Sequence, residues 1–126
     1  MVRTEIYGAD KNILIAPELA MTIGCIVSNA GVTTTDDSGN KVIKAGTPVG
    51  GATNVLENRQ TELTVGGTAQ GVVLHDVHFK NGATTENATL VIAGTVDLLK
   101  LDSDVVGAVE TAKSDLTKII FMKGAK

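Results

Sequence analysis

The chain has 126 residues and a net charge of −3, from 11 basic and 14 acidic side chains, a length typical of one domain. Its basic residues are scattered and only 2% of its residues are aromatic, a composition that argues against nucleic-acid binding. The longest apolar runs are too short to span a membrane, no signal peptide is recognised, and the single cysteine, Cys25, excludes an internal disulfide.

Residues 1–40 are the least regular part of the sequence. Short apolar runs at 12–16 and 21–27 are separated by Pro17, and a polar, turn-forming stretch follows at 33–40. These runs are too broken for an independent core, so we expect an N-terminal arm and connecting loop that lies on another surface, such as a neighbouring subunit. Cys25, within the second run, is expected to be a small buried apolar residue rather than a reactive thiol.

Residues 41–126 are predicted to form a β-rich domain, because 40 residues of the chain are β-branched: 15 Val, 9 Ile and 16 Thr. A strand is expected at 41–44, then a glycine turn and an extended piece restrained by Pro48. Residues 71–80 form the clearest strand. Its two faces alternate, with one set at Val73, His75, Val77 and Phe79 and the other at Val72, Leu74, Asp76 and His78.

Neither of these faces is cleanly polar, so cover on both sides is expected. Asn81-Gly82 is a strong hairpin signal, because both positions tolerate a positive φ; the alternative is a longer loop that extends through Asn87. We therefore expect residues 71–80 to pair antiparallel with a long strand at 89–98.

After residue 101 the spacing of the apolar residues changes from that of a strand to that of a helix. A short helix is predicted within residues 102–116, started by Asp102 or Ser103, and a last strand is predicted at 117–123. The apolar face of this helix would consist of Val105, Val109, Ala112 and Leu116. The predicted fold class is therefore mainly β: a small β-barrel or β-sandwich with one short helix near the C-terminus and an extended N-terminal arm.

Structural roles explain the polar and ionisable side chains of the sequence better than catalysis or metal binding does. His75 and His78 point to opposite faces of a strand, so one metal ion would not reach both. Capping and solubility account better for the carboxylates of Asp97, Asp102 and Asp104. The glycine-rich stretches at 46–51 and 66–71 lack the Lys-Ser/Thr ending of a phosphate loop, and Ser28 lacks a nucleophile-elbow context. We expect no catalytic residue, no metal site, no cofactor and no enzyme activity.

Three segments carry a resemblance to a known family: Ala-Gly-Thr-Pro-Val at 45–49, Gly-Val-Val-Leu-His-Asp-Val-His-Phe at 71–79 followed by Asn-Gly, and Ala-Gly-Thr-Val-Asp-Leu at 93–98. Together with the C-terminal helix and strand, they resemble the capsid decoration proteins of tailed bacteriophages, also labelled head-stabilisation or head fiber proteins. The resemblance covers about residues 41–123. His78 departs from the acidic residue expected after Asp-Val.

The resemblance implies a β-rich cement protein, made in the host bacterial cytoplasm and bound to the outer capsid surface of the virion, where it stabilises the lattice of the major capsid protein. It further implies a homotrimer whose N-terminal arm reaches over the capsid protein. On this basis Ile13, Leu14, Ile15 and Leu19 are the expected capsid-binding residues of the arm. Neither a nucleic acid nor a membrane is an expected partner. The alternative is a carbohydrate-binding or host-adhesion module displayed on the virion, although such modules usually present aromatic platforms.

Overall fold

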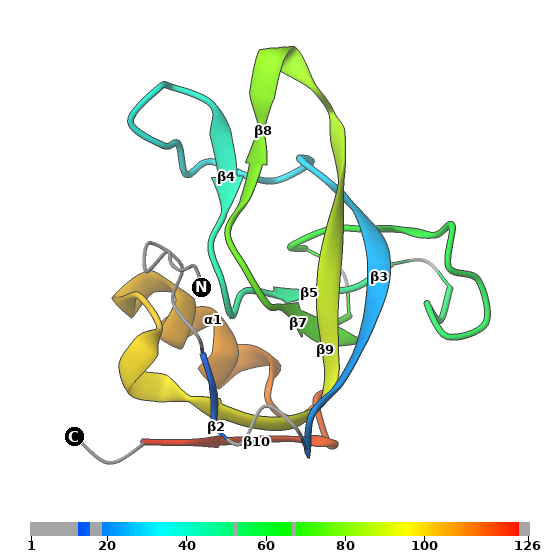
Figure 1. Ribbon diagram of the computed structural model, residues 1–126, viewed down its shortest axis with the longest axis vertical. Helices are drawn as coiled ribbons and strands as arrows, with labels where there is room; N and C mark the ends of the chain where they lie inside the picture. The colour runs from blue at the N-terminus through cyan, green and yellow to red at the C-terminus, as the bar shows by residue number, and fades with distance from the viewer. Residues whose placement is uncertain (1–12, 16–18, 52, 67, 124–126) are drawn as a thin grey trace, which may run out of the picture.

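The computed structural model describes residues 13–15, 19–51, 53–66 and 68–123, which form a mainly β fold with one short α-helix near the C-terminus (Figure 1). This confirms the expected mainly β fold with one short helix near the C-terminus. The helix is α1 (Ser103–Ala112). The strands are β2 (Leu14–Ile15), β3 (Met21–Ser28), β4 (Lys41–Ile43), β5 (Pro48–Val49), β6 (Glu62–Leu63), β7 (Gly71–Val73), β8 (Val77–Phe79), β9 (Thr85–Asp97) and β10 (Ile119–Met122).

The main sheet curls into a nearly closed barrel. Its hydrogen-bonded order is β5-β7-β9-β3-β6. A bridge next to the two outer strands joins its ends: the N–H of Gly50 donates to the carbonyl of Thr64 at 3.0 Å, and the N–H of Thr64 donates back at 2.8 Å. Because this bridge pairs the outer strands with each other, few of their backbone groups are left at a free edge. Of the two predicted architectures, the structure has the barrel.

The 13-residue strand β9 belongs to two parts of the sheet. Its first part pairs antiparallel with β3 and β7, whereas residues 94–97 pair with β2 on one side and in parallel with β10 on the other. Gly94 marks the change with a φ of 142°, and a Cβ at this position would lie only 2.9 Å from the Cβ of Ala20. We call β2, residues 94–97 and β10 the basal sheet, which lies below the barrel in Figure 1.

Two apolar clusters occupy the two sides of the sheet. One fills the barrel and consists of Cys25, Val27, Val32, Ile43, Val49, Val55, Leu63, Val73, Val77, Phe79 and Leu90. The other lies between the sheet and α1 and consists of Ile13, Ala45, Ala69, Val72, Val91, Val96, Leu101, Val105, Val109, Leu116 and Ile119. Adjacent residues of β7 and β9 thus point into different clusters, which explains why neither side of these strands reads as polar.

The continuous strand predicted at 71–80 is wrong, because it divides into β7 and β8 around a bend at 74–76. β7 pairs antiparallel with β9 as predicted, but β8 pairs with β4. Asp76 stabilises this bend. Its carboxylate accepts a hydrogen bond from the N–H of Ala45 at 2.8 Å, in place of the backbone bond that a continuous strand would make. The Asn81-Gly82 turn is confirmed, with φ values of 58° and 76° and a bond of 3.1 Å from the N–H of Ala83 to the carbonyl of Lys80.

The described residues of the expected N-terminal arm are built into the body of the fold. β3 pairs with β9 over its whole length and with β6 on its other side, so it is an inner strand of the barrel. Ile13 is fully buried between the sheet and α1. The expectation that this stretch lies outside the body is therefore wrong, because its apolar side chains complete both clusters of the core. Residues 1–12 lie outside the described residues.

The C-terminal prediction holds. α1 covers ten of the predicted helical residues, and Val105 and Val109 are its buried positions. Leu116 is buried as expected, but it follows the end of the helix, and β10 begins at Ile119. The short helix thus closes one side of the sheet, opposite the barrel interior.

Candidate functional site

Two of the three segments that carry the resemblance pair directly, because β5 pairs with β7. β7 pairs with β9 at Leu90 and Val91, just before the third segment, whose residues 94–97 pair with β2 and β10 instead. The N–H of Gly46 donates to the carbonyl of Val73 at 2.7 Å, and the N–H of Val73 donates to the carbonyl of Thr47 at 3.2 Å. Gly46 has a φ of 91°, and a side chain there would collide with Leu101. The first two segments therefore form one corner of the fold, where Gly46 permits the turn of the backbone and Val49, Val72 and Val73 pack in the core.

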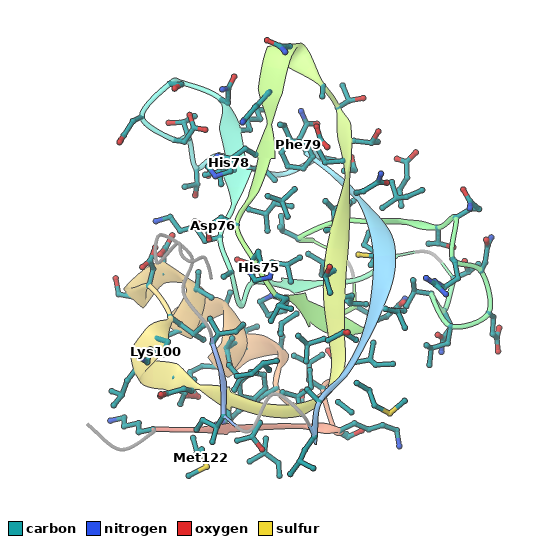
Figure 2. The ribbon with its side chains drawn as sticks, in the orientation of Figure 1. His75, Asp76, His78, Phe79, Lys100 and Met122 are labelled. Atoms are coloured by element: carbon teal, nitrogen blue, oxygen red, sulfur yellow. The ribbon has the colours of Figure 1, made fainter. Side chains whose placement is uncertain are left out.

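The histidines of the second segment do not converge on one site. His75 is exposed at the bend, whereas His78 lies on β8 and faces the loop at 36–40 (Figure 2). The Nδ1 atom of His78 is 2.7 Å from Oδ2 of Asp36. The other oxygen of Asp36 accepts from the N–H groups of Ser38 at 2.9 Å and Asn40 at 3.0 Å. The hydrogen bond with His78 is the main cause that lowers the pKa of Asp36.

This pair therefore fastens a loop to a strand. Within the described ranges, no cluster of three or more His, Cys, Asp or Glu side chains is arranged to hold a metal ion.

The three aspartates near the helix also have structural contacts. Asp97 is buried and accepts a hydrogen bond from the N–H of Leu99 at 3.0 Å. Asp102 and Asp104 lie 3.0 Å and 3.8 Å from Nζ of Lys44, so they join the end of β4 to the start of α1. The hydrogen bond to Asp102 raises the pKa of Lys44. Asp102 is the helix N-cap by position, but its carboxylate pairs with this lysine rather than with a helix N–H.

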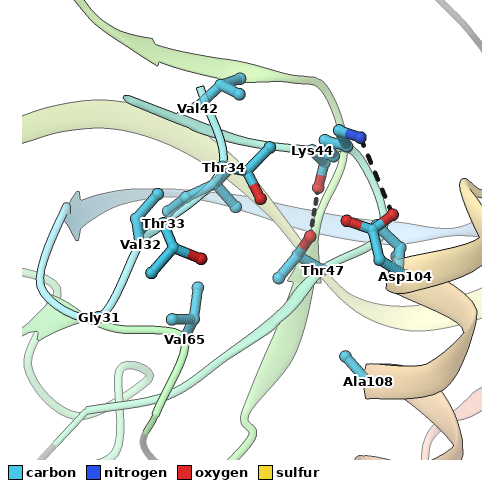
Figure 3. A pocket seen from close by; sticks show the side chains of 12 residues that line it. Gly31, Val32, Thr33, Thr34, Val42, Lys44, Thr47, Val65, Asp104 and Ala108 are labelled. Atoms are coloured by element: carbon cyan, nitrogen blue, oxygen red, sulfur yellow. Dashed lines mark hydrogen bonds and ion pairs between the residues drawn. The ribbon is translucent and has the colours of Figure 1, made fainter. Parts of the chain in front are cut away.

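A hollow of about 170 Å³ lies beside this ion pair (Figure 3). Its walls are mainly threonines and small apolar side chains, and Lys44 and Asp104 stand at its rim. Because two carboxylates outnumber the single lysine, this group of three has a net negative charge and offers no free positive charge to an anionic ligand.

Cys25 points into the barrel. Burial raises the pKa of its thiol to about 11, and the charge of Arg59 lowers it by a smaller amount. The thiol is therefore protonated at neutral pH and packs as a small apolar group, as expected.

The structure does not bring the four expected capsid-binding residues together. Ile13 is 0% exposed, and Leu14 packs against the same cluster near α1. Ile15 is half-buried in β2, whereas Leu19 is 77% exposed. Only Leu19 is thus broadly available to a partner, and Ile13 serves the core.

A surface that the sequence did not indicate lies on the lower side of the molecule in Figure 1. Large apolar side chains are exposed there near the starts of β3 and β10 and along β10, which Figure 2 shows for Met122, pointing away from α1. We give the name basal surface to the exposed Leu19 and Met21 near the start of β3, to Leu56, which lines the same groove as Met21, and to Ile120 and Met122 on β10.

A groove of about 460 Å³ forms part of the basal surface. Met21, Leu56 and Lys118 line it, and Ile92 and Leu116 contribute further apolar area. From Lys118 the surface continues along β10, because alternate residues of a strand share a face and Ile120 and Met122 are both exposed. The arrangement provides apolar contact area rather than converging reactive groups. A polar residue at every second position of β10 would have revealed this surface in the sequence. Buried Ile119 and exposed Ile120 are both isoleucine, so the sequence carries no such signal.

Comparisons of the chain with protein-family models, with curated proteins and with solved structures find no match. In the part of the chain that the structure describes, no helix is long and apolar enough to cross a membrane.

Proposed function

We propose that this protein is a capsid decoration protein of a tailed bacteriophage, which binds the outer surface of the head and stabilises the lattice of the major capsid protein. The observation that carries the proposal is the basal surface, where Ile120 is 63% and Met21 is 61% exposed on strands paired with β9. Exposed apolar side chains gathered beside a groove are typical of a protein contact. The resemblance of the three core segments supplies the identity of the partner.

The physical requirements of a cement protein agree with this surface. Full burial of one large apolar side chain contributes about 1.5–3 kcal/mol, so a few such residues give only a modest affinity for each copy. We propose a homotrimer, in which three such contacts act together and increase the apparent affinity by a factor on the order of 10²–10⁴. Such a protein needs contact area and fixed geometry, and the barrel with its basal sheet supplies both.

Of the four arm residues expected to bind the capsid, the proposal keeps Leu19 as a direct contact. Leu19 extends the basal surface next to Met21, whereas buried Ile13 supports β2 from inside. The carbohydrate-binding alternative gains no support from the described aromatic residues, because Phe79 is buried and Phe121 packs against the cluster near α1.

Binding to phage heads tests the proposal. Expanded heads that lack the protein are mixed with it and sedimented, and the bound fraction is measured against protein concentration. We expect saturable binding that Ile120→Lys weakens by about tenfold or more, since a charge replaces buried apolar area. Thr85→Lys is the matched control, because Thr85 is also exposed on a strand but lies at the opposite end of β9. Wild-type protein that stays in the supernatant would overturn the proposal.

A further inference from the structure

β10 has one free edge. It pairs with β9 on one side, and no strand in the described ranges pairs with its other side. The N–H of Gly94 donates to the carbonyl of Lys118 at 3.2 Å, which fixes the direction of the alternating backbone groups. In a parallel ladder, alternate residues direct their N–H and C=O groups to the same neighbour. Ile120 and Met122 therefore face β9 with their backbone, and Phe121 presents its N–H and C=O to the free edge.

The residues of this edge offer little protection against pairing. Natural sheets usually guard a free edge with charges, prolines or bulges within the strand, but β10 reads Ile-Ile-Phe-Met. Its charges stand just outside it, at Lys118 and Lys123, and both side chains are exposed. An unguarded edge beside the apolar basal surface is suited to an added strand, since backbone bonds would give affinity and alternate side chains would give specificity.

The two lysines indicate what kind of strand fits. Two copies of β10 can pair antiparallel through this edge only with residues that face it opposite each other, such as Phe121 opposite Phe121; Lys123 of one copy would then lie opposite Ile119 of the other and gain no ion pair. A strand with an acidic residue near each end would instead be attracted. Asp115 lines the groove beside Lys118, so the acidic residue near Lys123 should matter more.

We infer that the free edge of β10 binds an extended segment of a partner protein, with alternating apolar residues and an acidic residue near each end. The inference rests on the proposed function in one respect, namely that the basal surface meets a partner. The chemistry of the docked strand is the same whichever protein supplies it.

Two labelled peptides test the inference on the full-length protein. One is acetyl-Glu-Val-Thr-Val-Thr-Glu-amide, whose two Glu residues are five positions apart like Lys118 and Lys123, and the other has Lys in place of both Glu residues. We expect the acidic peptide to bind about tenfold more tightly at low salt, since two rim ion pairs change from attraction to repulsion. The double variant Lys118→Glu/Lys123→Glu should reverse the preference, and Lys118→Gln/Lys123→Gln should abolish it. Lys41→Glu/Lys80→Glu has the same charge change on β4 and just after β8, and it should leave the preference intact.

Hydrogen exchange provides the structural readout. The amide of Phe121 should exchange rapidly in the free protein and be protected when the acidic peptide is bound, because that N–H would then donate to the peptide. The inference is overturned if neither peptide binds at about 1 mM, the limit of weak specific binding. It is also overturned if both peptides bind equally, or if the protein self-associates through β10 in a manner that Ile120→Lys abolishes. Peptide binding without head binding would support strand docking and contradict the capsid role.

Discussion

His78 and Asp36 are joined at 2.7 Å across 42 residues of sequence, and this contact fastens the polar loop at 36–40 to β8. The same carboxylate accepts two N–H groups of its own loop, so one side chain organises the turn and anchors it. Such a contact makes the stability of this end of the barrel depend on the ionisation of Asp36.

The stability of the protein should fall in acid partly through Asp36. Its pKa is lowered from 3.8 in the folded protein, so its contribution is present above about pH 4. The contribution is lost as the pH falls through the folded pKa, because protonation removes the favoured charged form. We expect Asp36→Asn to flatten the decline in the urea midpoint between neutral pH and about pH 3. Asp37→Asn, in the same loop, is the control, and equal pH profiles for wild type and Asp36→Asn would contradict the prediction.

Gly46→Ala should destabilise the protein by about 2 kcal/mol or more, because the new Cβ adds a collision with Leu101 to a strained φ of 91°. Gly39→Ala is the matched control: Gly39 has a φ of 84°, but its Cβ would meet nothing within 4 Å. That variant should cost about 1 kcal/mol, from backbone strain alone. Chemical denaturation measures both changes, and equal losses would show that packing against Leu101 contributes nothing.

Removal of residues 1–35 should prevent folding. This truncation deletes β3, which pairs with both β9 and β6, and it empties the positions of Cys25 and Val27 inside the barrel. We expect the shortened protein to lack the dispersed amide NMR spectrum of a folded domain. Val27→Ala in the full chain should cost about 2 kcal/mol by the loss of buried area and the cavity it leaves. A folded truncated protein would show that β3 is dispensable.

Cys25 should resist thiol reagents in the native state. Its pKa of about 11 keeps the thiol protonated at pH 8, and the side chain is 5% exposed. Reaction with a disulfide reagent should therefore proceed only as fast as the protein opens, and it should become rapid in denaturant. Cys25→Ala/Thr85→Cys places the single thiol at an exposed position and should react at once. Rapid native labelling of wild-type Cys25 would contradict its placement in the barrel.

Local signals in the sequence predicted local structure well. Asn81-Gly82 marked a turn because both residues tolerate a positive φ, and the four-residue spacing of Val105 and Val109 marked the helix. The pairing of β3 with β9 was not predictable in this way. The strands are more than 50 residues apart, and an apolar run in the sequence does not indicate which other strand it pairs with. The run at 21–27 therefore looked like an arm, although Cys25 and Val27 alternate into the barrel.

The basal surface could not be predicted from the sequence, because its residues are apolar like those of the core. Alternation reveals the outer face of a strand only when that face is polar, and β10 is apolar on both faces. Ile120 and Met122 therefore read as core in the sequence, whereas the structure exposes them. The same absence of polar residues that hid this surface is the reason to expect a partner on it.

A three-dimensional image of phage heads with and without the bound protein tests the central claim most directly. The account predicts added density in groups of three copies on the outer shell, with β10 and the groove toward the capsid and the turn between β8 and β9 pointing away. Heads that show no added density at saturating protein, or density with that turn against the shell, would contradict it.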